Sequence, residues 1–201
     1  MKVLGITGGV GAGKSTVLNY LENRYNARVI QADLVGKMLQ EPGQECFAKM
    51  VEAFGPVILQ EDGRVCRGKL AEMVFADPEK LRRLNAIIHP AVKDYITEEI
   101  EREKRKRERP FCVIEAALLL EDRYDLICDE IWYIYTEVPV RIRRLAKSRG
   151  YSEEKTRQII SNQLSEEEYR GKCNFVIDNS SNIVENTYGQ IDKGLIEHGF
   201  L

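Results

Sequence analysis

Short apolar runs alternate along the chain with longer segments in which apolar residues recur every three or four positions. The runs that read as buried strands cover residues 1–6, 27–31, 111–120, 130–136 and 173–178. Strands separated by helical segments favour a parallel sheet with helices on both faces. The pattern therefore predicts an α/β fold with a doubly wound parallel sheet flanked by helices.

The long segment between the second and third runs has helical spacing. From about residue 34 to residue 109, apolar positions such as Leu81, Leu84 and Ile88 fall on one helix face, and turn-forming stretches such as "FADPE" interrupt the pattern. We expect a mostly helical subdomain inserted between two strands of the sheet.

A dense run of charge, "EEIEREKRKRER" at 98–109, ends this segment just before Pro110. A polyanion site and a solvated helix both fit such a run. Its acidic residues stand four positions before basic ones, which is the order that stabilises an exposed helix. These pairs are Glu98/Arg102, Glu101/Arg105 and Glu103/Arg107. We therefore expect a solvated helix that Pro110 ends.

Residues 138–170 form a segment of different character, in which Pro139 suits a first helical turn and Gly150 a helix end. A second helix is expected from Ser152 to about Leu164. The first helix is rich in basic residues, namely Arg141, Arg143, Arg144, Lys147 and Arg149. An ordinary basic surface helix and a mobile lid are both possible. Beside a phosphate site the lid is favoured, because phosphoryl transfer needs positive charge at the moving group.

The stretch "GITGGVGAGKST" at Gly5–Thr16 contains the spacing G-x-x-x-x-G-K-[ST]. It follows an apolar strand and precedes a helical pattern, which is the context that a phosphate-binding P-loop requires. Glycines let backbone N–H groups converge on a phosphate, and the helix N-terminus adds positive potential. Lys14 is expected to neutralise the β- and γ-phosphates of a bound nucleotide, and the Ser15 hydroxyl to ligate Mg²⁺.

The composition of the chain limits the kinds of partner that it is expected to bind. The 201 residues suit a single unit with insertions, and 30 basic against 32 acidic residues leave a net charge of -2. No overall field therefore favours nucleic acid or an anionic membrane. The five cysteines are odd in number and lack a C-x-x-C pair, so neither a disulfide framework nor a zinc site is expected. The first apolar run breaks at Gly8, too early for a signal peptide, and we expect a cytoplasmic protein.

Among P-loop proteins, the missing motifs exclude several classes. The chain has no N-K-x-D motif, with which GTPases recognise guanine, and no glycine-rich signature motif of transporter ATPases. The class that remains is a small-molecule kinase. Asp33 follows the carboxyl end of the second strand, where ligands of open α/β sheets bind. It is expected to act as general base for an acceptor hydroxyl, the alternatives being a carboxylate in the second shell of Mg²⁺ or a helix cap.

An ordered set of motifs follows the glycine loop. It comprises "AD" at 32–33, "EPG" at 41–43, "FG" at 54–55, "DG" at 62–63, "LN" at 84–85, "HP" at 89–90, "LLLE" at 118–121, "RIRRLAKSRG" at 141–150, Gln163 and "VIDN" at 176–179. Through nearly its whole length the chain resembles the dephospho-coenzyme A kinase family. The resemblance implies ATP-dependent phosphorylation of the ribose 3′-hydroxyl of dephospho-CoA, the final step of coenzyme A synthesis.

The resemblance also implies an organisation and a set of site residues. It divides the chain into a core (1–35, 110–137 and 171–201), a helical acceptor-binding subdomain (36–109) and a lid (138–170). The catalytic residues would be Asp33, Lys14 and Arg144. The ATP-binding residues would be Gly11, Ala12, Gly13, Lys14, Ser15, Thr16, Arg149 and Asn179. The acceptor would contact Asp33, His89, Leu118 and Glu121, and the metal would contact Ser15.

Two positions depart from the family pattern. Gln31 replaces the usual acidic or small residue, and Ala117 replaces the proline that commonly precedes the leucine pair. Neither removes the expected aspartate, because Asp33 is retained. Two other functions stay open at this point: a nucleotide or nucleoside kinase of related fold, and a non-enzymatic nucleotide sensor. The chain is expected to be a monomer or a weak homo-oligomer, with no nucleic-acid or membrane partner.

Overall fold

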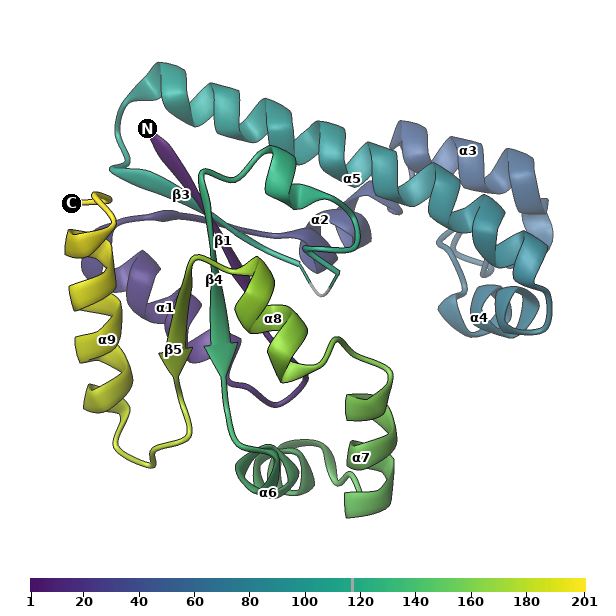
Figure 1. The fold of residues 1–201 in the computed structure, drawn as a ribbon. Helices are drawn as coiled ribbons and strands as arrows, with labels where there is room; N and C mark the ends of the chain where they lie inside the picture. The colour runs from purple at the N-terminus through teal and green to yellow at the C-terminus, as the bar shows by residue number, and fades with distance from the viewer. Residues whose placement is uncertain (117) are drawn as a thin grey trace. The chain divides into compact units, whose positions relative to one another are not determined.

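A computed structural model describes residues 1–116 and 118–201, so the departure at Ala117 lies outside the described residues. The chain divides into two compact units. The first combines Met1–Ile30 with Arg102–Leu201, and the second is Gln31–Glu101. Figure 1 shows the sheet of the first unit and the helices of the second, and each unit is described by itself.

A five-stranded sheet forms the framework of the first unit, with the order β2-β3-β1-β4-β5. β1 runs parallel to both of its neighbours, β3 and β4, and β4 runs parallel to β5. The parallel sheet predicted from the apolar runs is therefore confirmed. The strands span Lys2–Thr7 (β1), Arg28–Gln31 (β2), Phe111–Glu115 (β3), Glu130–Tyr135 (β4) and Phe175–Asp178 (β5).

Two helices pack with these strands in the main hydrophobic core: α1 (Lys14–Tyr25) and α9 (Val184–Glu197). The indole of Trp132 is fully buried there, against the rings of Phe175 and Phe200. Polar contacts also join the two helices, because the hydroxyls of Tyr20 and Tyr25 both donate to the carboxylate of Asp192 in α9. No element was predicted from sequence in the region of α9.

The third apolar run is shorter as a strand than expected. β3 ends at Glu115, and by Leu118 the chain has entered a turn in which Asp122 N–H donates to Leu118 O at 2.8 Å. The expectation of a strand to residue 120 is therefore wrong. The apolar pattern was misleading because side chains beyond the strand are also buried. Leu119 is fully buried and lies close to Gly5, so the apolar pattern continues although the backbone has turned.

The second unit is helical and has its own apolar core. This core contains Cys46, Met50, Ile58, Leu70, Val74 and Leu84. An isolated antiparallel bridge between Leu59 and Val65 brackets the turn at Gly63, which the sequence pattern showed only as a break. The helices are α2 (Ala32–Leu39), α3 (Glu45–Phe54), the 3-10 turn η1 (Pro56–Ile58), α4 (Arg67–Phe75) and the first part of α5 (Pro78–Lys106).

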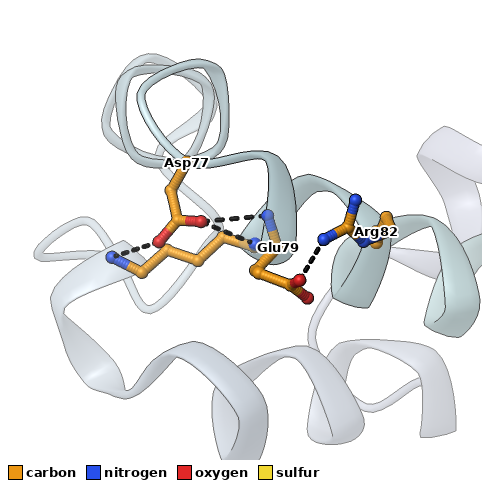
Figure 2. Close-up of polar contacts among 4 residues, drawn as sticks. Asp77, Glu79 and Arg82 are labelled. Carbon is orange, nitrogen blue, oxygen red and sulfur yellow. Dashed lines mark hydrogen bonds and ion pairs between the residues drawn. The ribbon is translucent and has the colours of Figure 1, made fainter.

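Asp77 caps the start of α5 (Figure 2). Its Oδ1 accepts hydrogen bonds from the N–H groups of Glu79 at 2.9 Å and Lys80 at 3.3 Å. These backbone bonds and the Lys80 charge hold the pKa of Asp77 below its usual value. Pro78 follows at the first helical position, where its missing N–H costs nothing. An ion pair between Glu79 and Arg82 lies on the next turn.

At its other end α5 stops at Lys106, three residues before the expected limit. Arg107 adopts a left-handed conformation with φ of 57°. The carboxylate of Glu103 then pairs with Lys106 at 2.8 Å, and the predicted partner Arg107 lies beyond the last helical turn. A residue in the left-handed conformation is a common helix end, so Pro110 is not what ends this helix.

Three helices follow β4, where two were expected. Gly150 caps α6 in the left-handed conformation, as predicted, and the Ser152 hydroxyl accepts from Lys155 N–H at 3.1 Å at the start of α7. The second helix ends at Ser161, not near Leu164. Ser165 and Glu168 then form a capping box that starts another helix. The bounds are Val138–Arg149 (α6), Glu153–Ser161 (α7) and Glu166–Lys172 (α8). Within the described residues, no helix has the length and apolar character of a membrane span.

Candidate active site

The glycine loop between β1 and α1 has glycine at the positions where the backbone takes a positive φ. Gly8 has φ of 152°, and a Cβ added there would lie 2.6 Å from the carbonyl oxygen of Ile134. Gly13, with φ of 86°, is the N-cap residue of α1 and supplies no side-chain cap. Thr16 N–H donates to the carbonyl oxygen of Gly13 at 3.0 Å. The N–H groups before it, at the start of the helix, have no intrahelical acceptor by geometry, so this end of α1 suits an anion.

Lys14 lies at the centre of the loop. Its Nζ donates to the carbonyl oxygen of Gly8 at 2.8 Å and lies 3.6 Å from Oε1 of Glu115. Glu115 is the last residue of β3 and pairs in register with Ile6, so its carboxylate reaches the loop that follows β1. Sequence analysis did not select Glu115. The available signal was an acidic residue at the end of an otherwise apolar strand.

The carbonyl oxygen of Ala12, inside the loop, is held from two directions. It accepts from Thr136 Oγ1 at 2.9 Å and from Asn179 Nδ2 at 2.8 Å. Asn179 is buried, and its Oδ1 accepts from Thr187 Oγ1 at 2.8 Å. The Asn179 side chain, which was expected to contact ATP, is therefore already used by the protein to hold the loop.

Arg144 of α6 lies beside the same part of the loop. Its Nη2 donates to the backbone carbonyl of Asn179 at 2.9 Å, and its Nη1 lies 3.3 Å from where a Cβ would stand on Gly13. Among the described residues this buried Nη1 has no hydrogen-bond partner. Burial lowers the pKa of the guanidinium, and the charge of Arg143 lowers it further. An unpaired, buried, cationic donor beside the loop suits a phosphate oxygen.

Arg149, the other arginine of α6 that was expected to bind ATP, has a different neighbour from Arg144. Arg149 is exposed in the last turn of α6, with its guanidinium carbon 6.0 Å from the ring centre of Tyr151. In this structure Arg149 therefore faces Tyr151, while Arg144 lies against the loop.

The residues expected at the acceptor fall in both units. Leu118, 46% exposed, and the exposed Glu121 lie in the turn after β3, in the unit that holds the glycine loop. Asp33 is exposed in the first turn of α2, directly after β2, and His89 is half-buried in α5. Both of these belong to the second unit.

The metal would depend on few protein ligands. Within the described part of the chain no group of three or more His, Cys, Asp or Glu side chains could hold a metal ion. The exposed hydroxyl of Ser15 in the first turn of α1 and the carboxylate of Glu115 are oxygen donors, which Mg²⁺ prefers together with nucleotide phosphates. The residues present therefore fit a metal that arrives with ATP.

The parallel sheet, the glycine loop with its lysine and the basic helix α6 define a P-loop kinase. The fold is shared with shikimate kinase from Acinetobacter baumannii, at a TM-score of 0.54 and 15% identity. It is also shared with the dephospho-CoA kinase from Campylobacter jejuni, at a TM-score of 0.73 and 23% identity, covering 100% of both chains. A Thermus thermophilus protein aligns at a TM-score of 0.82 and 27% identity, covering 98% of this chain and 97% of its own.

Comparisons of sequence give the particular family. The dephospho-CoA kinase family model matches residues 2–185. A dephospho-CoA kinase from Oceanobacillus iheyensis is 35% identical, with 96% of each chain covered. One from Thermobifida fusca is 39% identical, over 90% of this chain and 88% of that protein. The chain belongs to the dephospho-CoA kinase family.

Its activity is the phosphorylation of dephospho-CoA to coenzyme A, the final step of coenzyme A biosynthesis, with ATP as phosphate donor. The resemblance seen in the ordered motifs is confirmed. The family assignment decides against the two other functions, a nucleotide or nucleoside kinase and a non-enzymatic sensor.

Proposed function

We propose that ATP binds with its phosphates in the loop Gly11–Thr16 and that Lys14 and Arg144 stabilise the transferring phosphoryl group. The observation that carries this proposal is the buried, unpartnered Nη1 of Arg144 beside Gly13, on the same loop as Lys14. Two cationic donors at one phosphate-binding loop supply what phosphoryl transfer needs, because charge spreads over the equatorial oxygens in the transition state.

Magnesium has two oxygen donors in this arrangement. Ser15 would contact the metal directly, and Glu115 would contact it directly or through water. When bound, the ion neutralises charge on the β- and γ-phosphates. Lys14 is 3.6 Å from Glu115, so the carboxylate also orients the lysine that contacts the phosphates. Arg149 and Asn179 are proposed as further ATP contacts, Asn179 through its backbone, because its side-chain amide already holds the loop.

Asp33 is proposed as the general base that accepts the proton of the ribose 3′-hydroxyl. It stands two residues after the carboxyl end of β2, and its side chain is exposed. Strand ends of this kind are where ligands of open α/β sheets bind. His89, Leu118 and Glu121 are proposed as acceptor contacts, within an organisation of core (1–35, 110–137, 171–201), acceptor subdomain (36–109) and lid (138–170). We expect the enzyme to act in the cytoplasm as a monomer or weak homo-oligomer, without nucleic acid.

Steady-state kinetics of Asp33→Asn tests the base. The substitution keeps the shape of the side chain and removes its basicity, so kcat should fall by about 10² to 10⁴. The dissociation constant of ATP should barely change. Lys14→Ala should instead weaken ATP binding and lower turnover together, because Lys14 contacts ground-state and transferring phosphates alike.

The matched control is Asp62→Asn, an exposed aspartate whose Oδ1 accepts from Arg64 N–H in a turn and which should keep full kcat. An Asp33→Asn enzyme within about tenfold of the parent would show that Asp33 is not the base. Partial recovery of the variant at high Mg²⁺ would also remove the base assignment and would place Asp33 in the second shell of the metal. Either result would leave the kinase assignment intact.

A further inference from the structure

Val10, in the glycine loop, has both of its main-chain polar groups held by side chains from the lid segment. Arg141 Nε donates to the carbonyl oxygen of Val10 at 2.8 Å, and the N–H of Val10 donates to Oε1 of Gln163 at 3.1 Å. The same Oε1 accepts from Arg141 Nη2 at 2.8 Å. The three residues therefore form a closed ring of hydrogen bonds that includes both main-chain polar groups of Val10.

The packing leaves no room for a side chain at the neighbouring position. A Cβ added to Gly9 would lie 2.9 Å from Gln163 Oε1 and would collide with Arg141 Nη2. Gly9 is not one of the glycines that the P-loop pattern itself specifies. Its presence is explained by the close approach of these two side chains to the backbone.

Among the residues that the structure describes, no carboxylate is paired with the charge of Arg141. Arg141 is 8% exposed, and in the described part of the chain its hydrogen-bond partners are a carbonyl and an amide. Burial lowers the pKa of the guanidinium, while the neighbouring Tyr133 and Tyr169 act to raise it. A buried cation that only neutral groups contact is costly for stability alone. The hydrogen bonds from this guanidinium fix the backbone of the phosphate loop, which is a role beyond stability.

We propose that Arg141 and Gln163 are positioning residues that hold the Gly9–Val10 backbone in the shape that receives ATP. Arg141 comes from α6 and Gln163 from the residues just after α7. They hold the loop at Val10, four residues before α1 begins at Lys14, where phosphate is proposed to bind. This role goes beyond the residues proposed to touch ATP, and it rests on the proposed place of ATP at the loop.

The test is the dissociation constant of ATP, measured by calorimetry on the intact enzyme, beside the KM values for both substrates. Gln163→Ala removes both acceptor contacts and should weaken ATP binding by about tenfold, while KM for dephospho-CoA stays within about twofold. Gln163→Glu keeps an oxygen that can accept from Val10 N–H and Arg141, so it should restore ATP binding. Arg141→Met should weaken ATP as Gln163→Ala does, and the double variant should lose less than the product of the two single losses.

Matched controls are Gln158→Ala on the exposed side of α7 and Arg143→Met on the exposed side of α6. Both should bind ATP like the parent. If Gln163→Ala lowers the melting temperature but binds ATP normally at low temperature, or if Gln163→Glu is as weak as Gln163→Ala, the positioning role is wrong. Lys14→Ala distinguishes failure of the positioning role from failure of the proposed ATP site. Normal ATP binding by Lys14→Ala would overturn the proposed place of ATP at the loop.

Discussion

Glu115 and Lys14 meet at the end of two adjacent strands, with 3.6 Å between Glu115 Oε1 and Lys14 Nζ. Both side chains are largely shielded from solvent, at 12% and 17% exposure. The lysine also donates to Gly8 O. The contact arises because β3 pairs in register with β1, which brings the last residue of one strand beside the loop that follows the other.

We therefore expect Glu115→Gln to lower kcat/KM by about 10- to 100-fold, the range seen when a group that orients a metal or its ligands is removed. The loss should be accompanied by a higher Mg²⁺ requirement, measured as rate against free Mg²⁺ at saturating ATP. Glu197→Gln, on an exposed residue at the end of α9, is the comparison. An unchanged Mg²⁺ profile for Glu115→Gln would show that Glu115 only orients Lys14.

Arg144→Ala should lower kcat by about 10² to 10³, the usual cost of removing one donor to a developing charge. It should also lower the free energy of unfolding by about 1 kcal/mol, because Nη2 loses its bond to Asn179 O at 2.9 Å. Turnover at saturating substrates and urea unfolding measure the two effects separately. Arg143→Ala on the exposed side of α6 should change neither. Full turnover by Arg144→Ala would remove this residue from the catalytic set.

Gly13→Ala should disrupt the loop, for two reasons. The alanine would have to keep φ of 86°, and its Cβ would collide with the amide of Asn179. We expect a loss of about 1 to 3 kcal/mol in unfolding free energy and no measurable ATP binding. Gly189→Ala is the control, because that glycine lies within α9 and an added Cβ meets nothing within 4 Å. It should stabilise the protein slightly. ATP binding by Gly13→Ala at the parent affinity would contradict the geometry.

Glu103 should make stability depend on pH. The hydrogen bond from Lys106 lowers the pKa of its carboxyl below the usual value, and the charges of Lys106, Arg28 and Arg109 act in the same direction. A lowered folded pKa means that the stabilisation is fully present above the ordinary carboxyl pKa, about 4.3, and is lost as the pH falls through the folded value.

Urea unfolding of Glu103→Gln and the parent at several pH values measures this. The variant should be less stable at pH 7, and the difference should shrink as the pH falls below about 4. Glu108→Gln, on an exposed residue just after α5, should match the parent throughout. A difference that is independent of pH would mean that Glu103 stabilises by packing and not by its charge.

The sequence by itself determined the class of this protein. The spacing of the glycine loop between a strand and a helix, the apolar runs of the sheet and the ordered motifs from Ala32 to Asn179 led to the family that the comparisons show. These features are local: each depends on residues within one turn, one strand or one helix start. The roles assigned to Asp33, His89 and Arg149 stay predictions.

Only the tertiary structure decided which groups hold the glycine loop. Glu115, Thr136, Asn179, Arg141 and Gln163 contact it from positions more than a hundred residues along the chain. No local pattern reports such pairings, because they depend on the strand order β3-β1-β4-β5 and on the register of each pair. The buried turn at Leu119 shows the same limit, because apolar spacing reports that a residue is buried but not the backbone conformation that buries it.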